Sequence, residues 1–391
     1  QADCIAGQPL DIIVSSYNTT NGQWTFGVAG KSNCGGAHNL SSNVWRFPDN
    51  YPNAAYRGRL IIFFEAHPNF DSEPCVISTP YGMRYAISTN PDDVTSWGQV
   101  QVMKDGDTNA TINAHPMGPG GGFDSTGMLH QLGQGSGSVA YLRMDTNLKF
   151  KYYNLIKGSS NNVNSPGCAW NAKLFPDDTI FVAWGTGGGD CGDAVDPYVL
   201  RFAKSTDRGN TWTNAAGMNL FTKESGISFG NSTFDVRAGY PRWFVLGRLN
   251  NGTPVILDAP PGGEVAIYKW IAGNTWSVAQ STQPADQFTN SGTMAVDEND
   301  NVLVYVANSF RDGVTYEWVV TSGATNWSTP TILFPNVSGS RYTNRLRGTV
   351  IAPQGQNPRV LLGWSVWYET PVAYHNIFFL DRLVSQALTQ T

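Results

Sequence analysis

Apolar residues recur along the chain in short runs that are bounded by glycine, proline and polar residues. β-Branched and aromatic residues dominate these runs, and no long window shows the periodicity of an amphipathic helix. The pattern therefore predicts an all-β fold built from many short antiparallel strands. The strongest predicted strands are spread evenly over the sequence and are Leu60–Glu65, Val139–Arg143, Thr179–Trp184, Tyr198–Lys204, Val265–Trp270, Val302–Ala307, Tyr316–Val320, Arg359–Trp364 and Asn376–Leu380.

One octapeptide specifies a particular turn between strands. Residues 205–212 read Ser-Thr-Asp-Arg-Gly-Asn-Thr-Trp, a complete Asp-box. We expect Asp207 to accept hydrogen bonds from its own turn and Gly209 to adopt a positive φ. We expect Trp212 to pack beneath the next strand. Turns of this kind close the blades of β-propellers.

Looser copies of the same turn-then-tryptophan ending occur at Trp97, Trp276 and Trp327. Trp212, Trp276 and Trp327 are separated by 64 and 51 residues. A four-stranded propeller blade with a loop takes roughly 40–50 residues. The spacing therefore favours repeated four-stranded blades.

The length of the chain limits the number of blades. Its 391 residues give about 56 per blade for seven blades and about 65 for six. No linker rich in proline or serine interrupts the pattern. We predict a single seven-bladed β-propeller over residues 1–391, with six blades as the alternative and with residues 1–35 as a closing N-terminal segment.

Composition supports this prediction and excludes some partners. The 42 glycines, 22 prolines and 13 tryptophans suit many short strands and tight turns. A net charge of −5 provides no basic stripe for nucleic acid. No apolar run approaches the length of a membrane span. We expect a monomer that binds neither nucleic acid nor membrane.

Several features indicate the secretory route. The chain begins at Gln1, as a mature protein does after removal of a signal peptide. We expect a secreted, extracellular glycoprotein. Seven glycosylation sequons are present, at Asn18, Asn39, Asn109, Asn231, Asn251, Asn326 and Asn336.

Five cysteines occur, and none has the C-x-x-C spacing of a zinc ribbon or redox pair. In an oxidising compartment we expect Cys168–Cys191 and Cys4–Cys34 to form disulfides. Cys75 is then a buried free thiol or the alternative partner of Cys34. No cofactor is expected, with a structural calcium ion as the alternative.

Propeller ligands bind where loops of several blades converge, so each histidine was weighed by its position. His67 directly follows an apolar strand, and His38 lies in a glycine-rich loop. His115 precedes another glycine-rich run. His130 and His375 fit surface or hydrogen-bonded structural positions.

Arginines supply the second set of candidates. Arg143 closes an apolar strand, where it either reaches solvent or faces a ligand carboxylate. Further candidates for substrate binding stand in two short segments, and arginines that converge on one face favour an anionic sugar such as a uronate. These candidates are Arg237, Tyr240, Arg242, Arg345 and Arg347.

Other catalytic patterns are absent or incomplete. Gly185–Gly189 lacks the Lys-Ser/Thr and the helix of a phosphate loop. No G-x-S-x-G nucleophile elbow occurs. The glutamates that a glycosidase needs are present, but none lies in a recognisable acid/base context.

Two consecutive segments, Arg57–His67 and Gly82–Trp97, resemble the first full blade of BNR-repeat propellers that include ulvan lyases and L-rhamnose-α-1,4-D-glucuronate lyases. Trp184–Asp190 and Gly239–Phe244 add further matches. The resemblance implies a seven-bladed propeller. It also implies a site of two His, one Tyr and one Arg that performs β-elimination on a uronic acid.

Carried onto this chain, the resemblance places the two histidines at His67 and His38 and the arginine at Arg143. The stretch that would carry the tyrosine, Phe123–Gly127, has none. His115, His130 or Tyr240 would then take the tyrosine's proton-transfer role. No metal is needed for this chemistry. The alternatives are a sialidase-like glycoside hydrolase and a non-catalytic lectin, because the Asp-box is structural.

Overall fold

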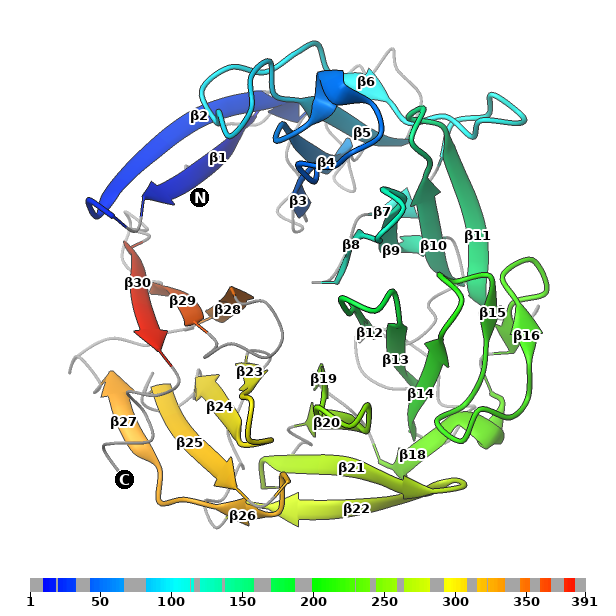
Figure 1. Ribbon diagram of the computed structural model, residues 1–391, viewed down its shortest axis with the longest axis vertical. Coiled ribbons are helices and arrows are strands. Elements are labelled where there is room, and N and C mark those ends of the chain that lie inside the picture. The colour runs from blue at the N-terminus through cyan, green and yellow to red at the C-terminus, as the bar shows by residue number, and fades with distance from the viewer. Residues whose placement is uncertain are drawn as a thin grey trace, which may run out of the picture. The chain divides into compact units, whose positions relative to one another are not determined.

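The computed structural model consists almost entirely of β-strands (Figure 1). Its contacts divide the chain into two compact units. Unit 1 comprises Gln1–Val163 with Thr222–Ser228, and unit 2 comprises Asn164–Phe221 with Phe229–Thr391. The structure describes residues 10–18, 20–32, 43–66, 82–112, 114–115, 120–135, 138–157, 170–186, 199–228, 230–239, 244–258, 264–281, 292–307, 315–321, 323–334, 345–351, 359–366 and 376–383.

Unit 1 contains three antiparallel sheets and one parallel strand pair, β11 with β17. The first sheet is the hairpin of β1 (Leu10–Asn18) and β2 (Gln23–Ser32). The second comprises β3 (Asn43–Arg46), β4 (Leu60–Ala66), β5 (Gly82–Ile87) and β6 (Gln101–Val102), in that order. The third comprises β7 (Ala114–His115), β8 (Gly121–Phe123), β9 (Leu129–Gly135), β10 (Ser138–Met144), β11 (Phe150–Lys157) and β17 (Ile227–Ser228).

In unit 2, four consecutive sheets follow the order of the chain. The first comprises β12 (Trp170–Leu174), β13 (Ile180–Thr186), β14 (Val199–Ser205) and β18 (Asp235–Ala238). The second comprises β19 (Phe244–Arg248), β20 (Pro254–Asp258), β21 (Ala266–Ala272) and β22 (Thr275–Gln280).

The third sheet of unit 2 comprises β23 (Gly292–Val296), β24 (Val302–Ala307), β25 (Thr315–Thr321), β26 (Asn326–Trp327) and β27 (Thr331–Phe334). The fourth comprises β28 (Arg345–Ile351), β29 (Arg359–Val366) and β30 (Asn376–Leu383). β15 (Thr211–Trp212) and β16 (Phe221–Thr222) form a separate short pair, and η1 (Ala54–Tyr56) and η3 (Ser232–Phe234) are single 3₁₀ turns.

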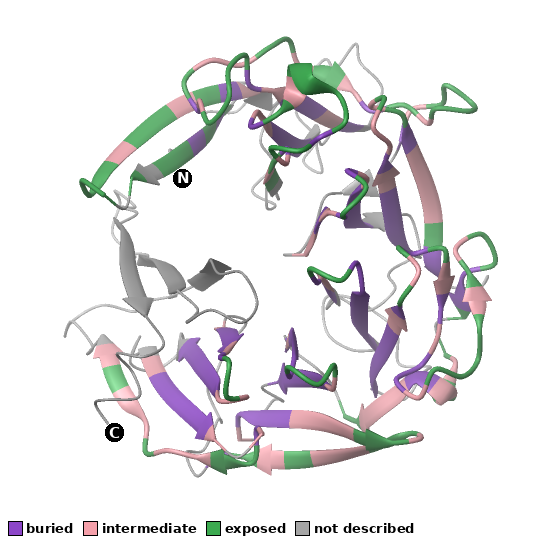
Figure 2. Cartoon of the chain, viewed as in Figure 1, coloured by how far each residue is buried: buried purple, intermediate pink, exposed green. Residues whose placement is uncertain are grey.

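All nine strands predicted from the apolar runs are present, with ends that differ by a few residues. The all-β class is therefore confirmed. Central strands are buried on both faces, whereas outer strands alternate (Figure 2). β20 is buried along its whole length, and β22 alternates between exposed and half-buried residues. This explains why inner strands are continuous apolar runs.

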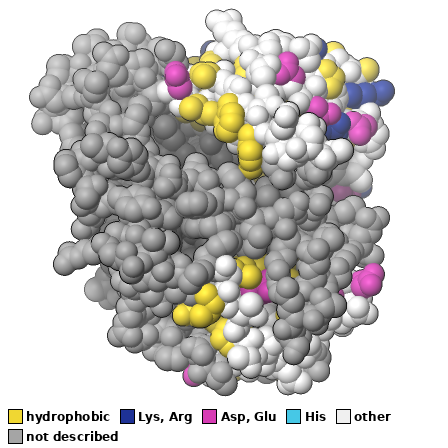
Figure 3. Space-filling view, turned by 90° about the vertical axis from the view of Figure 1, so that its left-hand side faces the viewer, with side chains coloured by type: hydrophobic (Ala, Val, Ile, Leu, Met, Phe, Trp, Pro, Cys, Tyr) yellow, Lys and Arg dark blue, Asp and Glu magenta, His cyan; other side chains and the backbone are white. Residues whose placement is uncertain are grey.

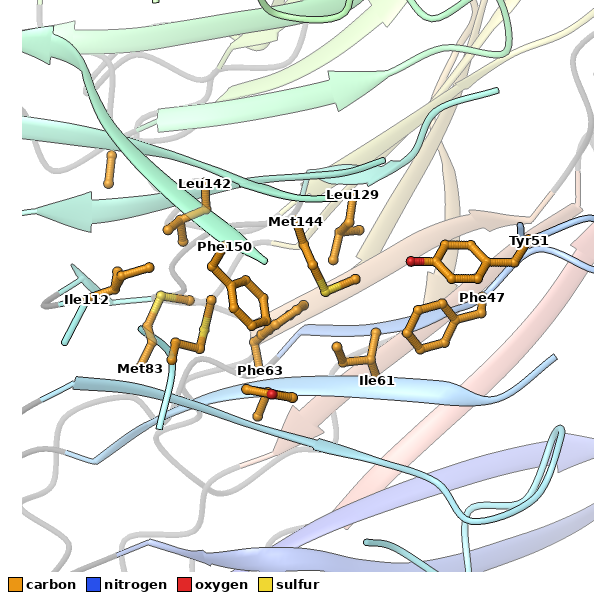
Figure 4. Close-up of a cluster of buried hydrophobic side chains, with 13 residues drawn as sticks. Phe47, Tyr51, Ile61, Phe63, Met83, Ile112, Leu129, Leu142, Met144 and Phe150 are labelled. Atoms are coloured by element: carbon orange, nitrogen blue, oxygen red, sulfur yellow. The ribbon is translucent and has the colours of Figure 1, made fainter. Parts of the chain in front are cut away.

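The core of unit 1 lies between its two larger sheets. Phe63 of β4 and Phe150 of β11 meet edge to face with ring centroids 6.1 Å apart. Leu142 and Met144 of β10 complete the contact from the same side (Figure 4). On the other face of the β3–β6 sheet, Phe64 packs in a cluster that includes residues of β1 and β2. Both faces of this sheet are therefore covered.

The outer face of the β1–β2 hairpin is apolar as well. Ile13, Phe26 and Val28 expose 64%, 62% and 49% of their surface, and Ile13 pairs with Val28 across the hairpin. Figure 3 views the side on which β1 and β2 lie, and hydrophobic side chains stand out on its upper part. Nothing in the described part of the chain covers this face.

The octapeptide at 205–212 forms the expected turn. Asp207 Oδ1 accepts from the backbone N–H of Thr211 at 2.8 Å and from the Ser205 hydroxyl at 2.8 Å. Gly209 has a φ of 74°, and Trp212 is fully buried. These hydrogen bonds outweigh the burial of Asp207, so its pKa lies below the usual value.

Replacing Asp207 by alanine removes this hydrogen-bond set from one turn. We expect Asp207→Ala to lower the free energy of unfolding by about 1–2 kcal/mol. Urea denaturation measures the change. Unaltered stability together with lost function would mean that the octapeptide belongs to a functional site.

A second turn recurs within the described residues, in most copies between two adjacent strands of a sheet. In each copy the fourth of five residues has a positive φ and donates its N–H to the first residue. The left-handed position holds glycine in three copies, aspartate in two and leucine in one, and glycine and aspartate are residues that tolerate it well. The copies are Asp124–Met128, Asp145–Lys149, Phe175–Thr179, Asn214–Met218, Leu249–Thr253 and Asp297–Asn301.

Candidate functional site

One end of unit 1 holds the last residue of the strand that precedes His67 and the start of the segment that carries His115. β4 ends at Ala66, and the N–H of Met83 on neighbouring β5 donates to Ile112 O at 3.0 Å. β7 follows shortly after Ile112, and its His115 pairs with Gln134 near the end of β9. We call this the Ala66 end. His67 itself, the residue after Ala66, lies outside the described residues.

Arg143 lies at the opposite end, which we call the Tyr51 end. Tyr51 precedes β4, and its hydroxyl donates to Asp145 O at 3.4 Å. Its ring centroid lies 5.7 Å from that of Phe123. Arg143 stands two residues before Asp145, with its Nε 2.9 Å from Sδ of Met128. Arg143 is therefore placed toward the start of β4, and Ala66, which leads into His67, is the last residue of that strand.

The other predicted residues are placed less completely. His38, Tyr240, Arg242 and His375 lie outside the described residues, as do all five cysteines. Arg345 and Arg347 stand at the start of β28, where they pair with Ser365 and Gly363 of β29.

Arg237 is held within unit 2 by several groups. Its guanidinium forms an ion pair with Asp258, whose side chain is fully buried. It also donates to the carbonyls of Ala238 and Gly239 at 3.0 and 2.7 Å, and it lies over the Tyr268 ring. Arg237 therefore fixes the backbone that leads directly into residue 240.

Arg84 is a residue that the sequence analysis did not single out. It stands on β5 opposite Phe64, two positions from the Ala66 end. Its neighbours Met83 and Ala86 belong to the cores on the two faces of the sheet. Burial lowers the pKa of its guanidinium from the usual value. A charged residue inside a strand covered on both faces was the signal that could have identified it.

A buried polar network occupies the Tyr51 end. His130 Nε2 lies 3.0 Å from Asp124 Oδ2, and Nδ1 lies 2.5 Å from the Tyr141 hydroxyl. His130 exposes 1% of its surface. Burial opposes ionisation of Asp124, but hydrogen bonds from His130 and Thr126 outweigh it and lower its pKa to about 2.

The ionised Asp124 only accepts hydrogen bonds, so His130 donates from Nε2. Nδ1 shares the second hydrogen bond with the Tyr141 hydroxyl. His130 is thus the buried, hydrogen-bonded residue that its sequence position suggested.

The described residues contain no evident metal site and a small cavity in the core of unit 1. No group of three His, Cys, Asp or Glu in the described part of the chain could hold a metal ion. A cavity in the core of unit 1, lined by Phe63, Met83 and Leu142 among others, has room for about 10 Å³. Ligand sites usually enclose roughly 300 Å³ or more, so this cavity is a packing defect.

No helix in the described residues is long and apolar enough to cross a membrane.

Comparison with known proteins identifies the fold. No family model matches the sequence, and no curated protein matches it. The structure is similar to that of an ulvan lyase of polysaccharide lyase family PL25 in complex with -[GlcA(1-4)Rha3S]-, with a TM-score of 0.65 and 14% identity. The similarity covers 97% of this chain and 90% of the lyase. A second structure of a PL25 ulvan lyase gives the same TM-score at 15% identity.

A sialidase from Trypanosoma rangeli is also similar, with 12% identity over 98% of this chain and 60% of the sialidase. Its TM-score of 0.46 is too low to carry an argument. These neighbours are carbohydrate-active enzymes, and at 14–15% identity the ulvan lyases establish the fold alone.

Proposed function

We propose that this protein is a polysaccharide lyase that cleaves beside a uronic acid by β-elimination. The observation that carries the proposal is the Ala66 end of unit 1, where β5, the neighbour of the strand leading into His67, is hydrogen-bonded to Ile112, shortly before the strand of His115. The ulvan lyase fold supports it, because the likeness extends over 97% of the chain.

Each proposed catalytic residue has one chemical role in the elimination. The C5 proton of a uronate is weakly acidic, so a guanidinium must neutralise the adjacent carboxylate. Neutral His67 takes the proton, and the C5–H electrons form the C4–C5 double bond as the C4–O bond breaks. His115 protonates the departing oxygen, with His38 and Tyr240 as alternatives. Arg242, Arg345 and Arg347 remain candidates for binding the anionic polymer.

The structure changes which arginine we favour as the carboxylate partner. Arg143 lies on β10 near Tyr51, toward the start of β4, whereas β4 leads into His67 at its other end. Arg84 stands two positions from the Ala66 end. We therefore assign carboxylate neutralisation to Arg84 in place of Arg143.

The proposal includes a single β-propeller. The recurrent turn joins two paired strands in each of four sheets, at Asp124–Met128, Phe175–Thr179, Leu249–Thr253 and Asp297–Asn301, as expected of repeated blades. Seven blades, secretion and a monomeric state are part of the same proposal.

Ulvan, glucuronan and gum arabic are suitable substrates for a direct test. A lyase creates an unsaturated uronate at each new end, and ultraviolet absorbance reports it. No rise on any uronate polymer would overturn the proposal. Reducing ends released without absorbance would indicate a glycoside hydrolase. Binding without either signal would indicate a lectin.

The two arginines can be compared directly. We expect Arg84→Gln to lower kcat/KM on the order of 100-fold, because an amide cannot neutralise the carboxylate. Arg143→Gln should stay near wild type. Initial rates of absorbance increase, with melting temperatures of both variants as control, measure the difference. The opposite ranking would place the carboxylate partner at the Tyr51 end and exclude His67 as the base.

A further inference from the structure

Two cations of unit 2 share one aromatic ring. Lys173 Nζ lies 5.7 Å from the centroid of Phe175, and the guanidinium carbon of Arg248 lies 4.2 Å from it. Lys173 is half-buried on the first strand of its sheet, β12, and Arg248 ends the first strand of the next, β19. Both side chains thus contact Phe175, which belongs to the hydrophobic cluster formed by residues of these two sheets.

Among the described residues, a counter-ion is found for the arginine of this pair and not for the lysine. Arg248 NH1 donates to both carboxylate oxygens of Asp177, at 2.8 and 2.7 Å. The neighbouring carboxylate, Asp178, forms an ion pair with Arg208. Among the described residues, Lys173 has neither a hydrogen bond nor an ion pair, and its one contact of this kind is the Phe175 ring. Its ammonium is therefore poorly compensated.

These surroundings lower the pKa of the Lys173 amine. Burial first, and the like charge of Arg248 second, lower the pKa of Lys173 to about 8. A lysine that is desolvated or placed beside another cation is an activated nucleophile. The proposed lyase reaction uses no amine, so this group has no part in it.

We propose that Lys173 is a covalent modification site for small aldehydes, including the open-chain form of reducing sugars. The Nζ lone pair attacks the carbonyl carbon, and a proton moves from nitrogen to oxygen to give a carbinolamine. Loss of water then gives an imine, so the step needs no oxidant or reductant. The Lys173 residue as a whole is half-buried, so only a small aldehyde can reach it.

The chain provides two lysines as internal standards. Lys151 is hydrogen-bonded to Asp107, which raises its pKa above the usual value. Lys204 is also buried enough to lower its pKa, but it donates to Ala215 O at 2.7 Å. The labelling rate of Lys151 is that of an ordinary lysine with a carboxylate partner. The labelling rate of Lys204 shows the effect of burial on a lysine whose ammonium still has a hydrogen-bond partner.

The experiment is competitive labelling of the native protein with substoichiometric glycolaldehyde and cyanoborohydride, near pH 8, where Lys173 is half deprotonated. The reductant converts each imine to a stable secondary amine, and peptide mass spectrometry reads the site. A larger fraction of Lys173 is deprotonated, but an amine of lower basicity is also a weaker nucleophile. The net effect should make Lys173 react about tenfold faster than Lys151. Lys204 should be intermediate.

Two variants locate the cause. Arg248→Met removes the like charge and leaves Asp177 to attract Lys173, so the labelling advantage should fall. Lys173→Met should remove the labelled peptide while the rate at Lys151 stays the same. Labelling of Lys173 no faster than of Lys151 in the wild type would overturn the proposal, whether or not either variant folds. The measurement uses no polysaccharide, so its outcome is independent of the proposed lyase activity.

Discussion

His67→Ala is expected to lower kcat/KM on uronate polymers by about 10³-fold or more, within the range attributed to loss of a general base. The residue follows β4 directly at the Ala66 end and is the base in the proposed elimination. A side chain beyond the end of a strand contributes little packing, so the melting temperature should change by only a few degrees. Absorbance of the unsaturated product and thermal denaturation together measure both effects.

His115→Ala and His375→Ala are the companion variants. His115 lies at the same end of unit 1, and as the proposed acid its loss should also reduce turnover strongly. His375 has no assigned chemical role, and its variant should retain activity. A His67→Ala protein that is active but much less stable would return His67 to a structural role. Equal effects of all three substitutions would argue against a specific base.

The strands could be predicted because each is a short apolar run with flanking turn residues. β24 begins and ends at the predicted residues, and β4 extends the prediction by one. The recurrent turn was missed because its copies share geometry and not residue type. Phe175–Thr179 has aspartate at the left-handed position, whereas Leu249–Thr253 has glycine. Only the fold shows that both have the same role.

The candidate site was harder to predict, because the sequence does not show at which end of the unit each strand terminates. His67 and Arg143 both stand at the end of an apolar strand in the sequence, and both therefore looked like residues presented to a ligand. β4 is the second strand of its sheet. β10 lies next to β9 in another sheet and is antiparallel to it. That order depends on the short strands β7 and β8, which have no clear sequence pattern. The burial of Arg84, which we propose as the carboxylate partner, depends on contacts on both faces of its sheet.

Asp258→Asn is expected to lower the free energy of unfolding by about 3–5 kcal/mol, the cost of breaking a buried ion pair. The Asp258 side chain is fully buried and that of Arg237 is 10% exposed. Asparagine preserves the shape and removes the charge, which leaves the guanidinium uncompensated in a dry site. Urea denaturation, with an unchanged dependence on denaturant, measures the loss.

The pair between Arg46 and Asp92 is the matched control, because it is the same ion pair at the surface. Its side chains expose 41% and 61%, so solvent screens the charges. We expect Asp92→Asn to cost less than about 1 kcal/mol. If Asp258→Asn were equally mild, Arg237 would not depend on its partner and would be available to a ligand, as the sequence first suggested. A large cost for Asp258→Asn alone would identify Arg237 as the residue that fixes Ala238 and Gly239 ahead of Tyr240.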